Sequence, residues 1–159
     1  KKYIGYLPNE DYLFGELTGR ENLEYTSLLK TGDKNWYKKL EREIEYFQMQ
    51  DDLDRPFKAY STGMKKKLQL LASLIGYPSI LIWDEPHNGL DVLSNIKIKE
   101  FLKEYISKDR AVFFSSHIIE MVENVCNNVI IIHRGEIVSQ IANPEKGSLT
   151  DIYLKATGE

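Results

Sequence analysis

The sequence has one cysteine, Cys126, among 159 residues, so no disulfide can form within the chain. A lone cysteine fits a reducing compartment. No apolar run approaches the roughly 20 residues that a membrane-spanning helix needs, and no signal peptide is visible. None of the ten glycines is followed by lysine, so the chain contains no G-x-x-x-x-G-K-S/T phosphate loop. We therefore expect a cytoplasmic protein without a phosphate loop in this chain.

The charge balance narrows the range of partners. The net charge is −3, with 28% charged and 42% apolar residues. A chain of this charge lacks the basic surface that broad binding to nucleic acid or anionic lipid requires, so we expect no nucleic-acid partner. Its composition is that of a folded globular protein, and its length suits one compact domain.

Short apolar segments alternate with amphipathic ones, which predicts an α/β sheet. The run Ile80–Trp83 predicts a central parallel strand that is covered on both faces. The capping-box pair Thr18 and Glu21 predicts the start of a helix. We expect strands at residues 3–7, 80–83 and 111–114, a closing hairpin at 129–132 and 137–141, and helices at 18–30, 36–49, 64–75, 94–106, 118–125 and from 148 on.

Two adjacent acids, Asp84 and Glu85, end the predicted central strand. Open α/β sheets bind ligands at the carboxyl ends of their strands. One acid there can hold Mg²⁺ through water, and its neighbour can polarise an attacking water. The bland alternative is a strand that runs into a charged turn, and the acid pair alone does not decide between them.

Three further segments lie at the ends of predicted helices or strands. Ser61-Thr62-Gly63-Met64 opens a helix whose first N–H groups can face an anion, although a routine cap followed by solvated lysines at 65–67 is the plainer interpretation. Residues 88–91 follow the acid pair, and a strand delivers Ser115, Ser116 and His117 to the same sheet edge. His87 and His133 are interpreted as an exposed loop residue and a strand-end residue, because no second ligand stands at metal spacing.

In this order and spacing the segments resemble the ATP-binding domain of exporter-type ABC transporters, over essentially the whole chain. Residues 3–9 are similar to the strand entering the Q-loop, 61–64 to the signature motif, 84–85 to the Walker B pair, 88–91 to the D-loop, and His117 to the switch histidine. The resemblance implies a P-loop ATPase-type parallel sheet core that is N-terminally truncated, with an inserted helical subdomain at 11–60 and a C-terminal hairpin. The core would comprise residues 1–10 and 61–159 of a single domain.

The resemblance also implies roles for individual residues. Glu85 would be the general base, His117 would contact the γ-phosphate, and Asp84 would be the outer-sphere Mg²⁺ ligand. The remaining implied ligands are Asn9 for Mg²⁺ and nucleotide, the signature residues Ser61, Thr62, Gly63 and Met64 for the nucleotide of the opposite subunit, and Asp91 at the dimer interface. ATP and Mg²⁺ are the implied cofactors.

The chain departs from the family pattern at three places. Asn9 stands in place of Gln, which shortens the reach to Mg²⁺ by one methylene, and Thr62 and Met64 replace the usual Gly and Gln. The phosphate loop is absent, so the resemblance implies that the N-terminal part of the sheet is missing and that this fragment is inactive by itself. We also expect that a strand beside the Walker B strand is missing.

The implied function is the ATP-hydrolysing subunit of an ABC transporter that couples hydrolysis to solute export. Its implied partners are ATP, a second ATPase subunit and membrane permease subunits at the inner face of the cell membrane. Two alternatives stay open: an ABC ATPase that transports nothing, and an inert interaction module. Residues 11–60 show no sustained heptads, which disfavours a chromosome-type member.

Overall fold

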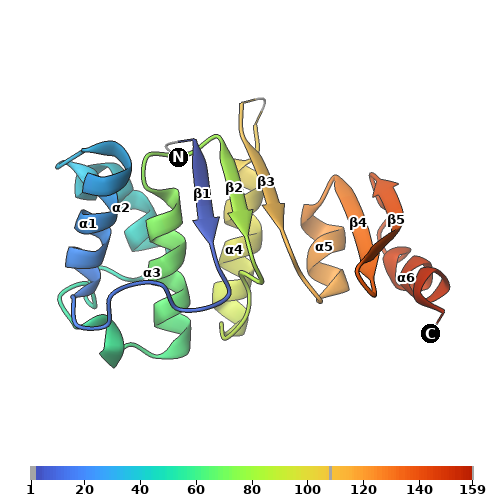
Figure 1. Cartoon of the computed structure of the whole chain (residues 1–159), viewed down its shortest axis with the longest axis horizontal. Coiled ribbons are helices and arrows are strands. Elements are labelled where there is room, and N and C mark those ends of the chain that lie inside the picture. Colours follow the sequence, from blue (N-terminus) through green and yellow to red (C-terminus); the bar gives the residue numbers. More distant parts are fainter. Residues whose placement is uncertain (1–2, 108, 159) are drawn as a thin grey trace. The chain divides into compact units, whose positions relative to one another are not determined.

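Residues 3–107 and 109–158 are described by a computed structural model, which divides into two compact units, Lys1–Ser115 and Ser116–Glu159. The first unit contains a parallel three-stranded sheet in the order β1-β2-β3 (Figure 1). Its strands are β1 (Ile4–Leu7), β2 (Ile80–Trp83) and β3 (Ala111–Phe114). The predictions of a parallel sheet and of Ile80–Trp83 as its central strand are confirmed.

The central strand has a partner on each side. Leu7 is in register with Trp83 across the β1–β2 pair, and Trp83 with Phe114 across the β2–β3 pair. The expectation that a strand beside β2 is missing is therefore wrong. Among the described residues, the open edges of this sheet belong to β1 and β3.

The two faces of the sheet differ in burial. Leu7, Leu81 and Trp83 share one face and are fully buried. On the other face Ile80 is 42% exposed and Phe113 is 62% exposed. For the residues that the structure describes, the prediction that β2 is covered on both faces is wrong, because α3 (Thr62–Leu74) and α4 (Val92–Tyr105) both pack on the face of Trp83.

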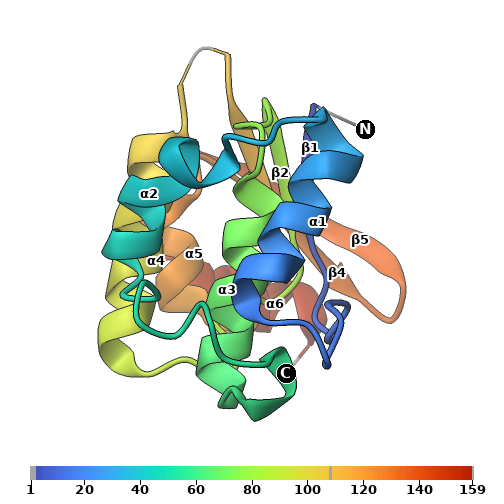
Figure 2. The same ribbon diagram turned by 90° about the vertical axis from the view of Figure 1, so that its left-hand side faces the viewer.

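The helical half of the first unit lies beside this sheet. Helices α1 (Gly19–Thr31) and α2 (Trp36–Tyr46) pack on α3, side by side with it in Figure 2. The short 3-10 helix η1 (Phe57–Ala59) leads into α3. Within residues 11–60 the described elements are helical, as predicted.

Side-chain caps explain where these helices begin. The Thr18 side chain accepts a hydrogen bond from the Glu21 N–H, and Glu21 Oε2 accepts from the Thr18 N–H at 2.8 Å, which confirms the predicted capping box. The Ser61 and Asp91 side chains cap α3 and α4, each by accepting a hydrogen bond from an N–H of the first helical turn. Each side chain satisfies an N–H that the first helical turn leaves without a partner.

The second unit consists of a hairpin and two helices. Helix α5 (Ile119–Val125) precedes strands β4 (Asn128–His133) and β5 (Glu136–Ala142), and α6 (Leu149–Thr157) follows them. The antiparallel register pairs His133 with Glu136, with an irregularity between Ile131 and Ile132. The predicted closing hairpin is confirmed. In the part of the chain that the structure describes, every helix is too short or too polar to cross a membrane.

Candidate active site

The acid pair stands at the carboxyl end of the central strand. The Asp84 N–H donates to the Leu7 carbonyl at 2.8 Å, which extends the β1–β2 ladder to the first acid. The Ser115 hydroxyl, just beyond β3, donates to Asp84 Oδ1 at 2.5 Å. Asp84 is thereby held between the ends of both neighbouring strands, where open α/β sheets bind their ligands.

Glu85 adopts a strained backbone conformation. Its φ is +45°, in the left-handed region that a residue with a Cβ rarely occupies, at a cost on the order of 1–3 kcal/mol. Two contacts hold it there. The Glu85 N–H donates to the Ser115 hydroxyl at 3.0 Å, and the Glu85 carbonyl accepts from the Asn88 N–H at 3.1 Å. Such strain concentrates at functional sites, which supports a role for Glu85 beyond packing.

His87 lies inside the fold and not on an exposed loop. The residue is 4% exposed, and its Nε2 lies 2.9 Å from Glu85 Oε2. The interpretation of His87 as an exposed loop residue is therefore wrong, because the turn at Glu85 brings the ring inward. His133 does end a strand, β4, as predicted.

One lysine of the predicted solvated run is buried. Lys66 is 4% exposed and its Nζ donates to the Asn9 carbonyl at 3.3 Å. Burial lowers the pKa of the Lys66 ammonium, and the charges of Asp84, Asp11 and Glu85 oppose that change. Lys66 therefore lies within the electrostatic reach of both acids. Its burial corrects the plainer interpretation of residues 65–67 as solvated.

Asn9 and Asn88 meet beside this lysine. The Asn88 side-chain amide donates to Asn9 Oδ1 at 3.4 Å. Asn9 itself follows β1 and is exposed, so its amide stands at the same sheet edge as the acids. Carboxylate and amide oxygens are the donors that Mg²⁺ prefers, so the donor set of Asp84 and Asn9 fits this ion.

The signature-like and D-loop-like segments pack against each other. A Cβ on Gly63 would lie 3.1 Å from the Gly89 carbonyl, and one on Gly89 would lie 2.7 Å from Thr62 Cγ2. Ser61 is exposed, and its hydroxyl accepts a hydrogen bond from the Met64 N–H at 3.3 Å. The first turn of α3 is thereby fixed on the segment that leads away from the acid pair.

Asp91 begins α4 at the end of that segment. It accepts hydrogen bonds from the Ser94 N–H and hydroxyl, both at 2.8 Å, and these bonds lower its pKa. The carboxylate therefore stays ionised as a helix cap. Its predicted place at a dimer interface stays a prediction.

His117 belongs to the second unit. It follows Ser115, the last residue of the first unit, by two positions. Because β2 and β3 are adjacent and parallel, their carboxyl ends share one edge. That Asp84, Glu85 and His117 converge at this edge stays a prediction.

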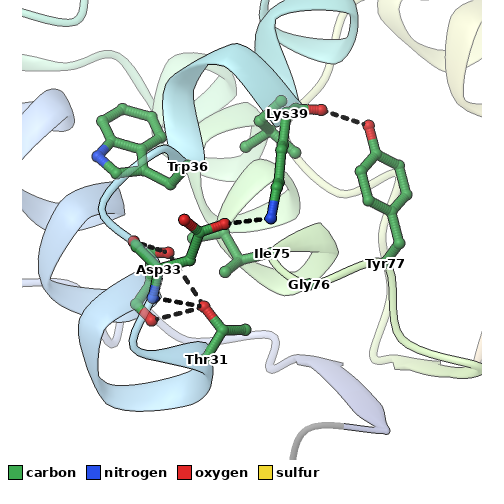
Figure 3. A pocket seen from close by; sticks show the side chains of 9 residues that line it. Thr31, Asp33, Trp36, Lys39, Ile75, Gly76 and Tyr77 are labelled. Atoms are coloured by element: carbon green, nitrogen blue, oxygen red, sulfur yellow. Dashed lines mark hydrogen bonds and ion pairs between the residues drawn. The ribbon is translucent and has the colours of Figure 1, made fainter.

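A cavity of about 340 Å³ lies elsewhere in the first unit (Figure 3). It is lined by Thr31, Asp33, Trp36, Lys39, Tyr77 and neighbours, none of them a predicted site residue. Lys39 points at Asp33, with Nζ 2.5 Å from Oδ2, and the Tyr77 hydroxyl contacts the Lys39 carbonyl at 2.7 Å. Its ion pair and hydroxyls already have partners within the fold. Its lining residues Ile75, Gly76 and Tyr77 precede the amino end of β2, whereas the acids follow the carboxyl end of that strand.

Comparisons with known proteins show the family of this chain. Residues 1–88, more than half of the chain, match the ABC transporter family. The chain belongs to the ABC transporter family. It is 34% identical over 161 aligned positions to the ABC transporter ATP-binding protein NatA of Bacillus subtilis (strain 168), covering 100% of this chain and 63% of that protein. The chain thus spans less than two thirds of this ABC relative.

Solved structures show the same fold. A structure of the ATP-binding subunit of an ABC transporter matches with a TM-score of 0.88 at 24% identity, covering 98% of this chain and 68% of that one. A dimeric post-hydrolysis state of an ATP-binding cassette with ADP and Pi matches with a TM-score of 0.78 at 19% identity, covering 89% and 63%. The α/β fold with a parallel sheet is therefore that of ABC ATPases.

Proposed function

We propose that this chain is part of the ATP-binding and ATP-hydrolysing subunit of an ABC transporter and that hydrolysis drives solute export. The observation that carries the proposal is the acid pair at the carboxyl end of β2, with Asp84 held by Ser115 and Glu85 held in a strained turn. Export is favoured by the exporter-like variants Thr62 and Met64. The names of the relatives, which are transporter ATP-binding proteins, favour transport over an ATPase that transports nothing.

The roles of the residues follow from the chemistry of hydrolysis. Glu85 accepts the proton of the attacking water, and His117 contacts the terminal phosphate. Asp84 and Asn9 would hold Mg²⁺, which neutralises phosphate charge when it is bound. In a dimer, the signature-like residues Ser61, Thr62, Gly63 and Met64 contact the nucleotide of the opposite subunit, and Asp91 lies at the interface. The opposite subunit is a second ATPase subunit, identical or not.

Residues 11–60 form the helical subdomain that contacts the permease subunits at the inner face of the cell membrane. Near its start Tyr12 and Phe14 are 42% and 53% exposed, and Phe14 packs edge-on against Tyr25 at 5.3 Å. Asn22 accepts from the Phe14 N–H at 2.9 Å and so holds this apolar loop in place. An ordered apolar surface of this kind suits a protein partner.

The test of the catalytic assignment is Glu85→Gln in the whole protein. The amide keeps the shape of the side chain but cannot accept a proton, so turnover should fall at least about a hundred-fold while ATP binding survives. ATP should then accumulate in a stable dimer, which size-exclusion chromatography with bound-nucleotide analysis detects. Turnover close to the parent rate would show that Glu85 is not the base.

A second test separates the docking surface from the site. Leu13→Ser with Phe14→Ser should uncouple transport from hydrolysis and leave the ATPase rate of the permease-free subunit unchanged. Loss of folding would show instead that these residues belong to the core.

The 159-residue chain alone should bind Mg-ATP weakly in calorimetry, because it lacks the glycine-rich loop and its lysine.

A further inference from the structure

His87 is a buried histidine in direct polar contact with the carboxylate of the proposed base. Its side chain is 3% exposed, against 21% for that of Glu85, and Nε2 lies 2.9 Å from Glu85 Oε2. An exposed pair at this distance would contribute little to orientation, because solvent and side-chain entropy compete with it. Because the His87 ring is buried, solvent has little access to the side of the Glu85 carboxylate that faces the ring.

The backbone explains why these two side chains meet. The positive φ of Glu85 reverses the chain, and the Asn88 N–H closes the turn onto the Glu85 carbonyl at 3.1 Å. The next hydrogen bond, from the Leu90 N–H to the His87 carbonyl at 3.3 Å, holds His87 itself. Both partners of the contact are therefore fixed by main-chain bonds, so the contact does not depend on a mobile loop.

We propose that His87 is the positioning residue for Glu85. The contact of Nε2 with Oε2 at 2.9 Å restricts the rotation of the carboxylate and so sets its orientation. This inference rests on the proposed function, because it needs Glu85 to act as the base. It goes beyond that function, since it assigns the orientation of the base to a residue of its own turn.

The plainer alternative is that His87 only fills space. In that case the buried ring would stabilise the turn without any effect on the chemical step. The two roles differ in what they require. Packing needs volume, whereas positioning needs a donor at the place of Nε2.

Two substitutions of His87 distinguish a packing role, which needs side-chain volume, from a positioning role, which needs a hydrogen-bond donor. His87→Gln puts an amide N–H close to the place of Nε2, and His87→Leu keeps an apolar side chain of moderate size with no donor. In the whole protein we expect His87→Leu to lower kcat about ten- to a hundred-fold, as loss of a group that orients a functional ligand does. KM for ATP and equilibrium ATP binding should change by no more than about two-fold, because orientation of the base affects the chemical step and not nucleotide binding. His87→Gln should recover most of the lost kcat.

Glu85→Gln serves as the reference variant. If His87 acts only through Glu85, His87→Leu should have no further effect on the residual turnover of Glu85→Gln. Thermal unfolding of each variant reports whether the turn still folds. If His87→Leu does not fold, NMR of ¹⁵N-histidine-labelled protein provides the test instead. The chemical shift of His87 Nε2 should differ between the parent protein and Glu85→Ala.

Each outcome bears on a distinct claim. Parent-like kcat in His87→Leu, equal loss in His87→Gln and His87→Leu, or an Nε2 signal that ignores Glu85→Ala overturns the positioning role and leaves the proposed function standing. Parent-like turnover in Glu85→Gln overturns the assignment of Glu85 as the base in the proposed function, and the positioning role with it.

Discussion

The two units of the chain differ in how much apolar surface each one buries. In Lys1–Ser115 the fully buried side chains include large residues such as Trp83, Phe47 and Phe57. In Ser116–Glu159 the described buried apolar side chains are those of Met121, Val125, Ile131 and Leu149. A segment of about 40 residues rarely buries enough surface to be stable alone. The first unit therefore has a core of its own, and the second depends on very few side chains.

The strands show the same difference locally. In β2, Leu81 and Trp83 are buried under α3 and α4. In the hairpin, Ile132 is 65% exposed and its cross-strand partner Ile137 is 58% exposed. Apolar strand residues thus contribute to stability only where a helix covers them, which the composition of the strand does not reveal.

The largest expected effect is a core truncation in the first unit. Leu81→Ala should lower the free energy of unfolding by about 2–5 kcal/mol, because it removes buried methyl groups and leaves a cavity. The matched change Ile132→Ala in the hairpin should cost less than about 0.5 kcal/mol, because that side chain is already in solvent. Urea denaturation of both variants provides the measurement. Equal losses would break the comparison between the units.

Two glycine substitutions, one in each unit, are expected to have intermediate effects on stability. A Cβ at Gly5 would lie 2.3 Å from the Ser73 carbonyl, so Gly5→Ala should cost about 1–3 kcal/mol through overpacking against α3. Gly135, in the hairpin turn at φ +84°, has open space around it. Gly135→Ala should cost only the backbone strain, about 1–2 kcal/mol. A larger loss for Gly135→Ala in thermal unfolding would contradict this order.

The smallest expected effects concern alkaline pH, and they have opposite signs in the two units. Burial lowers the pKa of Lys30 to about 8 and raises that of Cys126 to about 11. Folded Lys30 releases its proton before the unfolded chain does, so its contribution to stability rises between about pH 8 and 10.5. Unfolded Cys126 ionises first, so its contribution falls between about pH 9 and 11.

Hydrogen exchange between pH 8 and 10 resolves these contributions, since it reports the opening of each unit separately. Lys30→Met should remove the rise in protection of β2 amides, and Cys126→Ser should remove the fall in protection of β4 amides. Wild-type slopes in both variants would show that other groups control the alkaline response.

Local patterns predicted most of the fold. The capping box at Thr18, the apolar run at Ile80–Trp83 and the Arg134-Gly135 turn each depend on neighbours in sequence, and each is confirmed. The order of motifs also led to the ABC family. These signals are readable because caps, strands and tight turns are set by interactions over a few residues.

Two residues of the site escaped prediction. Lys66 is one of three successive lysines, and only its helical spacing from Gln69, Leu70 and Ser73, all buried, marked it as inward-facing. His87 carried no such signal, because the left-handed turn at Glu85 is not a preference of glutamate and is held by Ser115 from another strand.

The residue pattern alone thus predicted the helices and strands, the parallel sheet and the position of the two acids at its edge. These features follow from hydrophobic periodicity, helix caps and the alternation of strands with helices. Packing decided which sheet face is covered, that β2 has neighbours on both sides, and that His87 meets Glu85. The physical reason is that burial and a strained turn depend on contacts between segments far apart in the chain, such as Ser115 with Glu85 and Ser73 with Trp83. No short stretch of sequence contains both partners of such a contact.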